Sequence, residues 1–233
     1  MDVRLQRSWL LVGPTGAGKT PLGLLLEERG VAGLRCFHFD FGAELRAVAA
    51  SCKGSPGLQA GEVQVIQRSL ATGALLEDHE FPIALKVLRA FARARGVGEN
   101  DRLVLNGLPR HIGQARMMED VVRIEAVVSL EAPPEAVRER ILLNTGGDRE
   151  DRPDDELRAI KRKLVIFRMR TLPLLEYYEN REVPVFKVPV GGRTTAEDMY
   201  SAVAEMLNPP RGIPRTSSRG RRGRPLDDCG GSG

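Results

Sequence analysis

The sequence predicts an α/β fold in which one parallel β-sheet is flanked by helices. Two observations support this prediction. Short apolar runs alternate along the chain with stretches of helical periodicity, and the first apolar run ends in a glycine-rich turn that opens a helix. The 233 residues are enough for one large domain with a full hydrophobic core.

Five short apolar runs are the expected strands. They are Trp9–Val12, Leu34–Phe39, Leu103–Leu105, Ala126–Leu130 and Val185–Val188. Three helical patterns lie between the second and third runs, at Gly42–Ser51, Glu62–Ala71 and His79–Ala94. One crossover between parallel strands needs less helix than this. The segment is therefore expected to project from the sheet as a small subdomain.

A long helical stretch is expected at Asp154–Glu179. Apolar residues recur there at steps of three and four, which predicts one buried stripe. The opposite face carries basic residues, among them Arg158 and Arg162. Pro173 is expected to kink the helix or to start a new turn, because proline lacks the N–H that a helix interior requires.

The turn after the first strand reads Gly13-Pro14-Thr15-Gly16-Ala17-Gly18-Lys19-Thr20, which matches the phosphate-loop pattern G-x-x-x-x-G-K-[ST]. Backbone N–H groups around Gly13, Gly16 and Gly18 are expected to surround nucleotide phosphates, aided by the helix dipole. Lys19 would reach the β- and γ-phosphates, and the Thr20 hydroxyl would hold Mg²⁺. The motif predicts nucleoside triphosphate binding and a P-loop NTPase-type sheet.

The net charge of +4 is located in the C-terminal tail. Residues 208–233 contain six arginines and two aspartates, so the other 207 residues are neutral. This tail is rich in Gly, Pro, Ser and Arg and lacks an apolar pattern, which predicts disorder. Nucleic-acid binding is not expected, except through counterion release at this tail.

The three cysteines show no metal-site spacing and suit a reducing compartment. No apolar run has membrane-spanning length, and no separate signal segment precedes Trp9. A cytoplasmic protein with no membrane association is therefore expected.

Four further segments accompany the phosphate loop: His38–Arg46, Asn106–Gln114, Arg152–Asp155 and Thr171–Tyr178. In this order and at this spacing, the set resembles the short-lid adenylate kinase family of nucleoside monophosphate kinases. The resemblance covers about residues 10–207. It implies a helical acceptor-binding insertion at about 41–75, a short lid at about 144–152 and transfer of phosphate from ATP to a monophosphate.

The resemblance also implies roles for individual residues. Arg46 and Arg110 match the pair that holds the acceptor phosphate, which suits the planar fork of a guanidinium group. Gln114 matches the residue that reads the adenine edge, and Leu76 lies in the segment that contacts the acceptor base. Arg140 matches the arginine that lies against the donor adenine.

No general base is required, because the acceptor is already an anionic phosphate. Catalysis then consists of alignment and of neutralising the negative charge that spreads in the transition state. The expected catalytic residues are Lys19, Arg110, Arg149 and Arg152, together with Mg²⁺.

The expected metal site departs from the family pattern. Asn106 replaces an aspartate that holds a metal-bound water, and its amide oxygen could accept from that water but carries no charge. Asp40 and Phe41 replace a Ser-Thr pair at the end of the second strand. Asp40 is either a substitute carboxylate for Mg²⁺ beside Thr20 or a cap of the next helix, and Phe41 either narrows the acceptor pocket or stacks on a base.

The lid also departs from the family pattern. Asn144 occupies the position of a phosphate-contacting arginine, and Arg149 is a candidate to supply the missing charge. Arg152 matches the arginine before the Asp-Asp pair, whereas the next family arginine falls on Lys163 or, one residue earlier, on Arg162. The lid has no cysteines, so zinc is not expected.

The sequence thus favours an ATP-dependent kinase for AMP, acting as a monomer. Two alternatives stay open. The acceptor could be CMP, UMP, a deoxynucleotide or a small metabolite, because Asp40 and Phe41 are unusual. The chain could also be a weakly catalytic nucleotide-binding regulator, which Asn106 and Asn144 would favour.

Overall fold

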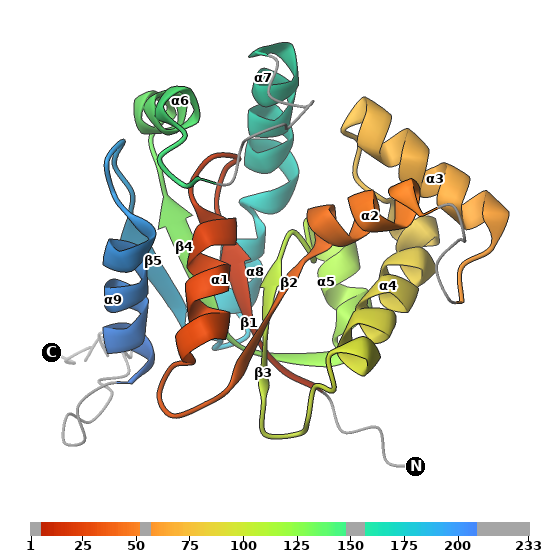
Figure 1. Cartoon of the computed structure of the whole chain (residues 1–233), viewed down its shortest axis with the longest axis horizontal. Coiled ribbons are helices and arrows are strands. Elements are labelled where there is room, and N and C mark those ends of the chain that lie inside the picture. The colour runs from red at the N-terminus through yellow and green to blue at the C-terminus, as the bar shows by residue number, and fades with distance from the viewer. Residues whose placement is uncertain (1–5, 52–56, 148–156, 209–233) are drawn as a thin grey trace, which may run out of the picture.

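A five-stranded parallel sheet forms the centre of the molecule, with strand order β2-β3-β1-β4-β5 (Figure 1). The computed structural model describes residues 6–51, 57–147 and 157–208. The strands are β1 (Gln6–Val12), β2 (Cys36–Asp40), β3 (Arg102–Asn106), β4 (Val122–Glu131) and β5 (Val185–Pro189). The predicted α/β class and the five parallel strands are confirmed, with ends shifted by up to four residues.

Helices cover both faces of the sheet. They are α1 (Lys19–Arg29), α2 (Phe41–Ala50), α3 (Ala60–Thr72), the 3₁₀ turn η1 (Asp78–Glu80), α4 (Phe81–Ala94), α5 (Ile112–Met118), α6 (Pro134–Leu143), α7 (Leu157–Ile166), the π turn η2 (Phe167–Thr171), α8 (Leu174–Glu179) and α9 (Ala196–Leu207). No helix of the described ranges is long and apolar enough to cross a membrane.

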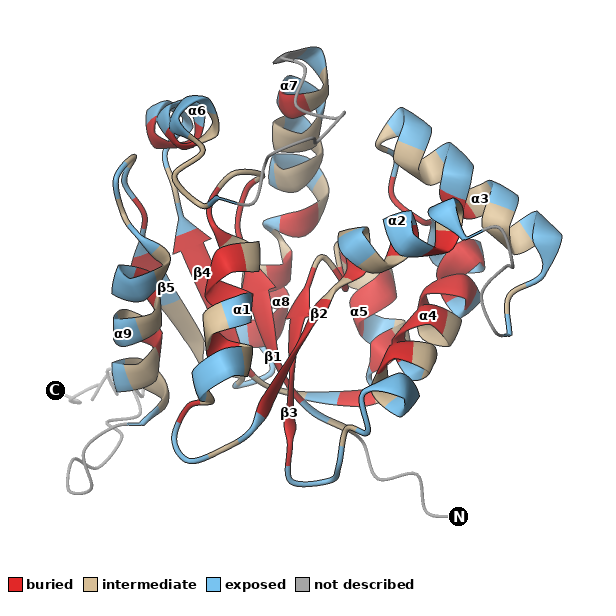
Figure 2. Cartoon of the chain, viewed as in Figure 1, coloured by how far each residue is buried: buried red, intermediate tan, exposed pale blue. Residues whose placement is uncertain are grey.

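The sheet separates two hydrophobic clusters. On β1, Trp9 and Leu11 pack with residues of α1 and α9, whereas Leu10 and Val12 pack with residues of α4, α5 and α8. Successive strand residues point to opposite faces, and both faces are covered, so the whole strand reads as apolar. Figure 2 shows this burial along the strands and the inward sides of the helices. The buried sheet fixes the strand ends that carry the site.

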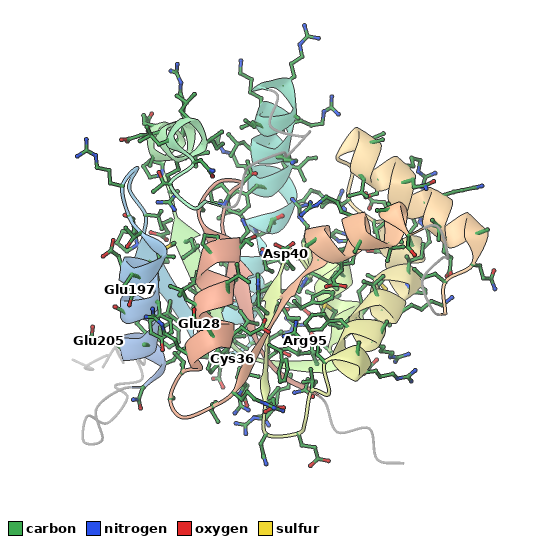
Figure 3. The ribbon with its side chains drawn as sticks, viewed as in Figure 1. Glu28, Cys36, Asp40, Arg95, Glu197 and Glu205 are labelled. Atoms are coloured by element: carbon green, nitrogen blue, oxygen red, sulfur yellow. The ribbon has the colours of Figure 1, made fainter. Side chains whose placement is uncertain are left out.

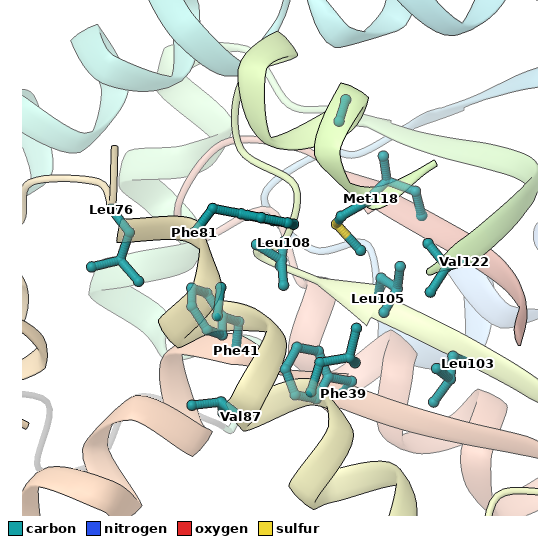
Figure 4. Packing of buried hydrophobic residues seen from close by; sticks show 14 of the residues in the cluster. Phe39, Phe41, Leu76, Phe81, Val87, Leu103, Leu105, Leu108, Met118 and Val122 are labelled. Carbon is teal, nitrogen blue, oxygen red and sulfur yellow. The ribbon is translucent and has the colours of Figure 1, made fainter. Parts of the chain in front are cut away.

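Helices α2 and α3 stand to one side of the sheet and pack on each other and on α4 (Figure 1). Phe41, the first residue of α2, is only 5% exposed. Its ring packs beside that of Phe39, with ring centroids 5.9 Å apart, within the cluster of Figure 4. Of the two expected roles of Phe41, narrowing the acceptor pocket or stacking on a base, this burial favours the first, because the turn into α2 directs the ring into the core. Phe41 also lines the neighbouring cleft.

The long C-terminal helical stretch is interrupted where Pro173 enters it. The Leu172 N–H donates to the Phe167 carbonyl at 2.8 Å, five residues back, and α8 begins directly after Pro173. The predicted new turn at Pro173 is confirmed, and the π turn before it was not expected. Of the predicted stripe, Ile160, Thr171, Leu174 and Tyr178 are buried, whereas Leu164 and Phe167 are half-buried.

Candidate active site

A cleft of about 610 Å³ opens at the carboxyl ends of β1, β2 and β3. The phosphate loop and Thr20 line one part of it, and α2, the segment 69–76 and α7 line the other. Among the described residues that line it, one is acidic, Asp40, and six are basic. The basic residues are Lys19, Arg46, Arg110, Arg158, Arg162 and Lys163. Such an excess of positive charge in a concave site attracts polyanions such as phosphates.

The phosphate loop needs its glycines for backbone conformation and for space. Gly16 and Gly18 have φ values of +80° and +96°, which residues with a side chain rarely adopt. A Cβ atom at Gly18 would lie 2.7 Å from the Met199 Cε atom. The Lys19 ammonium donates to the Gly13 and Pro14 carbonyls, at 2.8 Å each. The loop thus curls around the end of the Lys19 side chain at the N-terminus of α1.

Thr20, Asp40 and Asn106 meet at the ends of three elements. The Thr20 hydroxyl donates to Asp40 Oδ2 at 2.7 Å. Asn106 Nδ2 donates to the same carboxylate oxygen at 3.0 Å and to Thr20 Oγ1 at 3.2 Å. Asp40 and Asn106 are paired residues of β2 and β3, so the sheet register holds them together. Figure 3 shows Asp40 at the junction of β2 and α2.

The two carboxylate oxygens of Asp40 have different partners. Its Oδ1 atom accepts from the Ala43 N–H at 2.9 Å and caps α2, while Oδ2 faces Thr20. Burial favours the neutral acid, but the bonds from Thr20 and Ala43 and the nearby charges outweigh it, so the pKa of Asp40 is lowered. The carboxylate is therefore charged at neutral pH.

Asn106 turns its amide nitrogen, not its oxygen, toward this group. A carboxylate only accepts hydrogen bonds, so the NH₂ group must face Asp40. Asn106 is thus placed to hold the carboxylate. This differs from the expectation that its oxygen accepts from a metal-bound water.

The acceptor-side candidates lie around the segment that follows β3. Arg46 and Arg110 both line the cleft, and burial lowers the pKa of the Arg110 guanidinium. Gln114 is 1% exposed, and its amide is engaged at both ends. Its oxygen accepts from the Arg110 N–H and its nitrogen donates to the Leu76 carbonyl, each at 2.8 Å. Gln114 therefore fixes Arg110 and Leu76 relative to each other.

The other predicted site residues are placed differently. Arg140 is 2% exposed and is not among the described residues that line the cleft. Asn144 ends α6 in the left-handed conformation. Arg149, Arg152 and most of the predicted lid lie outside the described residues, as does the tail after residue 208.

Arg158 of α7 was not predicted as a site residue, and Arg162 was considered only as one of two registers for a family arginine. Both line the cleft together with Lys163, so either register considered for the family arginine reaches it. Arg162 also donates to the Thr72 carbonyl at 2.6 Å, across the cleft from α7. The sequence signal was available, because Arg158 and Arg162 are four residues apart on the polar face of the expected helix.

The wall formed by α7 and η2 is also joined to the opposite side by an ion pair. Arg170 of the π turn donates to both Glu77 oxygens, at 3.2 and 3.0 Å. Such a two-point contact between guanidinium and carboxylate has fixed geometry. The segment after α3 is thereby held toward η2.

Comparison with known proteins identifies the family. An adenylate kinase of Xanthomonas campestris pv. campestris (strain 8004) is 30% identical over 178 residues, covering 74% of this chain and 85% of that protein. An adenylate kinase of Synechococcus sp. (strain WH7803) is 32% identical over 184 residues, covering 76% and 87%. The chain belongs to the nucleoside monophosphate kinase family. This kinase is therefore a phosphotransferase with a nucleotide-binding phosphate loop.

The relatives of this kinase carry different acceptor names. The probable UMP-CMP kinase 1 of Arabidopsis thaliana is 31% identical over 146 residues, covering 62% of this chain and 63% of that protein. No family model matches the chain. The relatives therefore establish the family, whereas their names differ in the acceptor nucleotide.

Proposed function

We propose that this kinase transfers the γ-phosphate of ATP to AMP and releases two ADP. The observation that supports it is the joint cleft, in which the phosphate loop and the Arg46–Arg110 pair contribute to one cavity with six basic residues. A triphosphate at the loop and a monophosphate at the two arginines would place their phosphates next to each other. Alignment of this kind supplies much of the catalysis in phosphoryl transfer.

The chain's own residues act on the phosphates. Lys19 would leave the Gly13 and Pro14 carbonyls to bind the β- and γ-phosphates. Arg110, with Arg46, would hold the acceptor oxygen in line with the γ-phosphorus as the bond to the β-phosphate oxygen breaks. Arg158, Arg162 and Lys163 lie on the wall that would neutralise the equatorial oxygens, a role that Arg149 and Arg152 of the lid would share.

The residues present fit Mg²⁺. A hydroxyl and a carboxylate, Thr20 and Asp40, offer the oxygen ligands that this cation prefers, with the remaining ligands left to phosphates and water. Held by Thr20 and Asp40, the cation would supply positive charge to the triphosphate. Asn106 would keep the Asp40 carboxylate directed at this position.

AMP is proposed as acceptor because Gln114 is present at the base-reading position. Its carboxamide has two donor and two acceptor sites, and the bonds to Arg110 and Leu76 use one of each. The remaining pair could read an adenine edge. CMP or UMP is the second candidate, since Gln114 is only 1% exposed and a named relative is a UMP-CMP kinase.

The function is tested by ADP formation from Mg·ATP with AMP, CMP, UMP and dAMP as acceptors. We expect AMP to give the highest kcat/KM. A higher value with CMP or UMP would reassign the acceptor, and tight ATP binding without turnover of any acceptor would favour a nucleotide-binding regulator. Gly18→Ala serves as the inactive control, because Gly18 has positive φ and no room for a Cβ.

Asp40→Asn separates the helix-capping role of Asp40 from its proposed role as a Mg²⁺ ligand. Asparagine and aspartate cap helices about equally well, so α2 should keep its start while the charge is lost. We expect the Mg²⁺ concentration for half-maximal rate to rise at least about tenfold, because contacts to charged groups contribute roughly 1.5–3 kcal/mol. An unchanged Mg²⁺ titration, with unchanged melting temperature, would show that Asp40 is only a cap.

A further inference from the structure

Arg140 of α6 contacts the phosphate loop and is not among the described residues that line the cleft. Its Nε atom donates to the Gly16 carbonyl at 3.0 Å. A Cβ atom built on Gly18 would lie 2.9 Å from Arg140 Nη2, so the guanidinium also closes the space behind Gly18. With 2% exposure, the side chain is among the largest fully buried ones of the described chain.

The same guanidinium contacts a second loop, Gly191–Thr194, which connects β5 to α9. Arg140 Nη1 donates to the Gly191 carbonyl at 3.1 Å and also to the Thr194 carbonyl. This loop is closed on itself, because Thr194 Oγ1 accepts from the Gly191 N–H at 2.9 Å. Thr145, just after α6, donates from its hydroxyl to the Gly192 carbonyl at 3.0 Å. Arg140 thus donates hydrogen bonds to both loops, and the Thr145 hydroxyl donates to the second.

We propose that Arg140 is a positioning residue that ties the phosphate loop to the Gly191–Thr194 loop. A planar guanidinium has five N–H donors in a rigid arrangement, which suits carbonyls that approach from different directions. Arg140 is 2% exposed and is not among the described residues that line the cleft, and the proposed role rests on its N–H groups rather than on the stacking on donor adenine that the family resemblance implies.

The consequence for binding rests on the proposed function. If Arg140 holds the phosphate loop in its binding conformation, less order has to be created when a triphosphate binds. The resulting gain in affinity then applies to any triphosphate and does not require a nucleobase. A residue that only contacts adenine would give no benefit to inorganic tripolyphosphate.

Two measurements on the full chain test the tie. Calorimetry of Arg140→Lys should show the affinities for ATP and for inorganic tripolyphosphate falling by the same factor, about tenfold, the loss expected when charged hydrogen bonds are removed. A loss of ATP affinity alone would overturn the proposal in favour of base contact. Thr145→Val is the matched variant and should leave tripolyphosphate affinity unchanged.

Hydrogen exchange of the ligand-free protein tests the same tie without any nucleotide. Arg140→Lys should speed exchange in peptides covering both 13–18 and 191–194, and Thr145→Val only in the second. Unchanged exchange at 13–18 in Arg140→Lys would overturn the proposal. If Arg140→Lys does not fold, Arg140→Gln replaces it in both measurements. If the wild-type chain binds neither ATP nor tripolyphosphate, the proposed function fails while the exchange data still decide the tie.

Discussion

Replacing Lys19 by methionine is expected to lower kcat by about a hundred- to a thousandfold, the usual loss when one preorganised charge donor is removed from a transition state. Methionine keeps the length and the apolar stem of lysine but has no charge. The Lys19 ammonium donates to the Gly13 and Pro14 carbonyls of its own loop. The melting temperature of the variant is measured alongside kcat.

Lys161→Met is the matched control. Lys161 is exposed on α7, four residues before Val165, and is not among the described residues that line the cleft. Coupled-assay kcat, ATP affinity and melting temperature should stay at wild-type values for this variant. A Lys19→Met enzyme with near-normal kcat would contradict the assignment of the phosphate loop as the donor site.

Replacing Arg110 by lysine should act on the acceptor. We expect kcat/KM for the monophosphate to fall by about a hundredfold, because one ammonium cannot make the two parallel bonds of a guanidinium to phosphate. ATP affinity should stay unchanged, since the phosphate loop is untouched. Initial rates at varied acceptor and fixed Mg·ATP separate the two effects.

Arg110 also gives a prediction for the melting temperature of the protein. Burial lowers the pKa of Arg110, so the folded chain is paying a cost to keep this charge in the cleft. Arg110→Met should therefore keep or raise the melting temperature while activity is lost. Arg116, exposed on the neighbouring α5, is the control position, and Arg116→Lys should change neither property. Equal losses of activity in Arg110→Met and Arg116→Lys would argue against Arg110 as an acceptor-binding residue.

The sequence predicted the parts of this fold that depend on local pattern. The buried strands are apolar throughout, so their positions were evident to within a few residues. The phosphate loop was evident because glycine is the residue that adopts the positive φ angles found at Gly16 and Gly18. Pro173 indicated a new turn because a missing N–H is itself a local property.

Contacts between distant segments could not be predicted in this way. Arg170 and Glu77 are 93 residues apart, and nothing near either residue indicates the other. The family pattern associated Arg140 with a ligand, whereas its carbonyl partners come from two loops that meet only in three dimensions. Which amide atom of Asn106 faces Asp40 likewise depends on the pairing of β2 with β3.

The two oxygens of Asp40 connect parts of the site that are usually considered separately. One oxygen caps α2, the helix that carries Arg46. The other accepts a hydrogen bond from the hydroxyl of Thr20. A rotation of α2 about its first residue would therefore shift the carboxylate relative to Thr20. Substitutions that remove both oxygens should then alter the affinities for both nucleotides together.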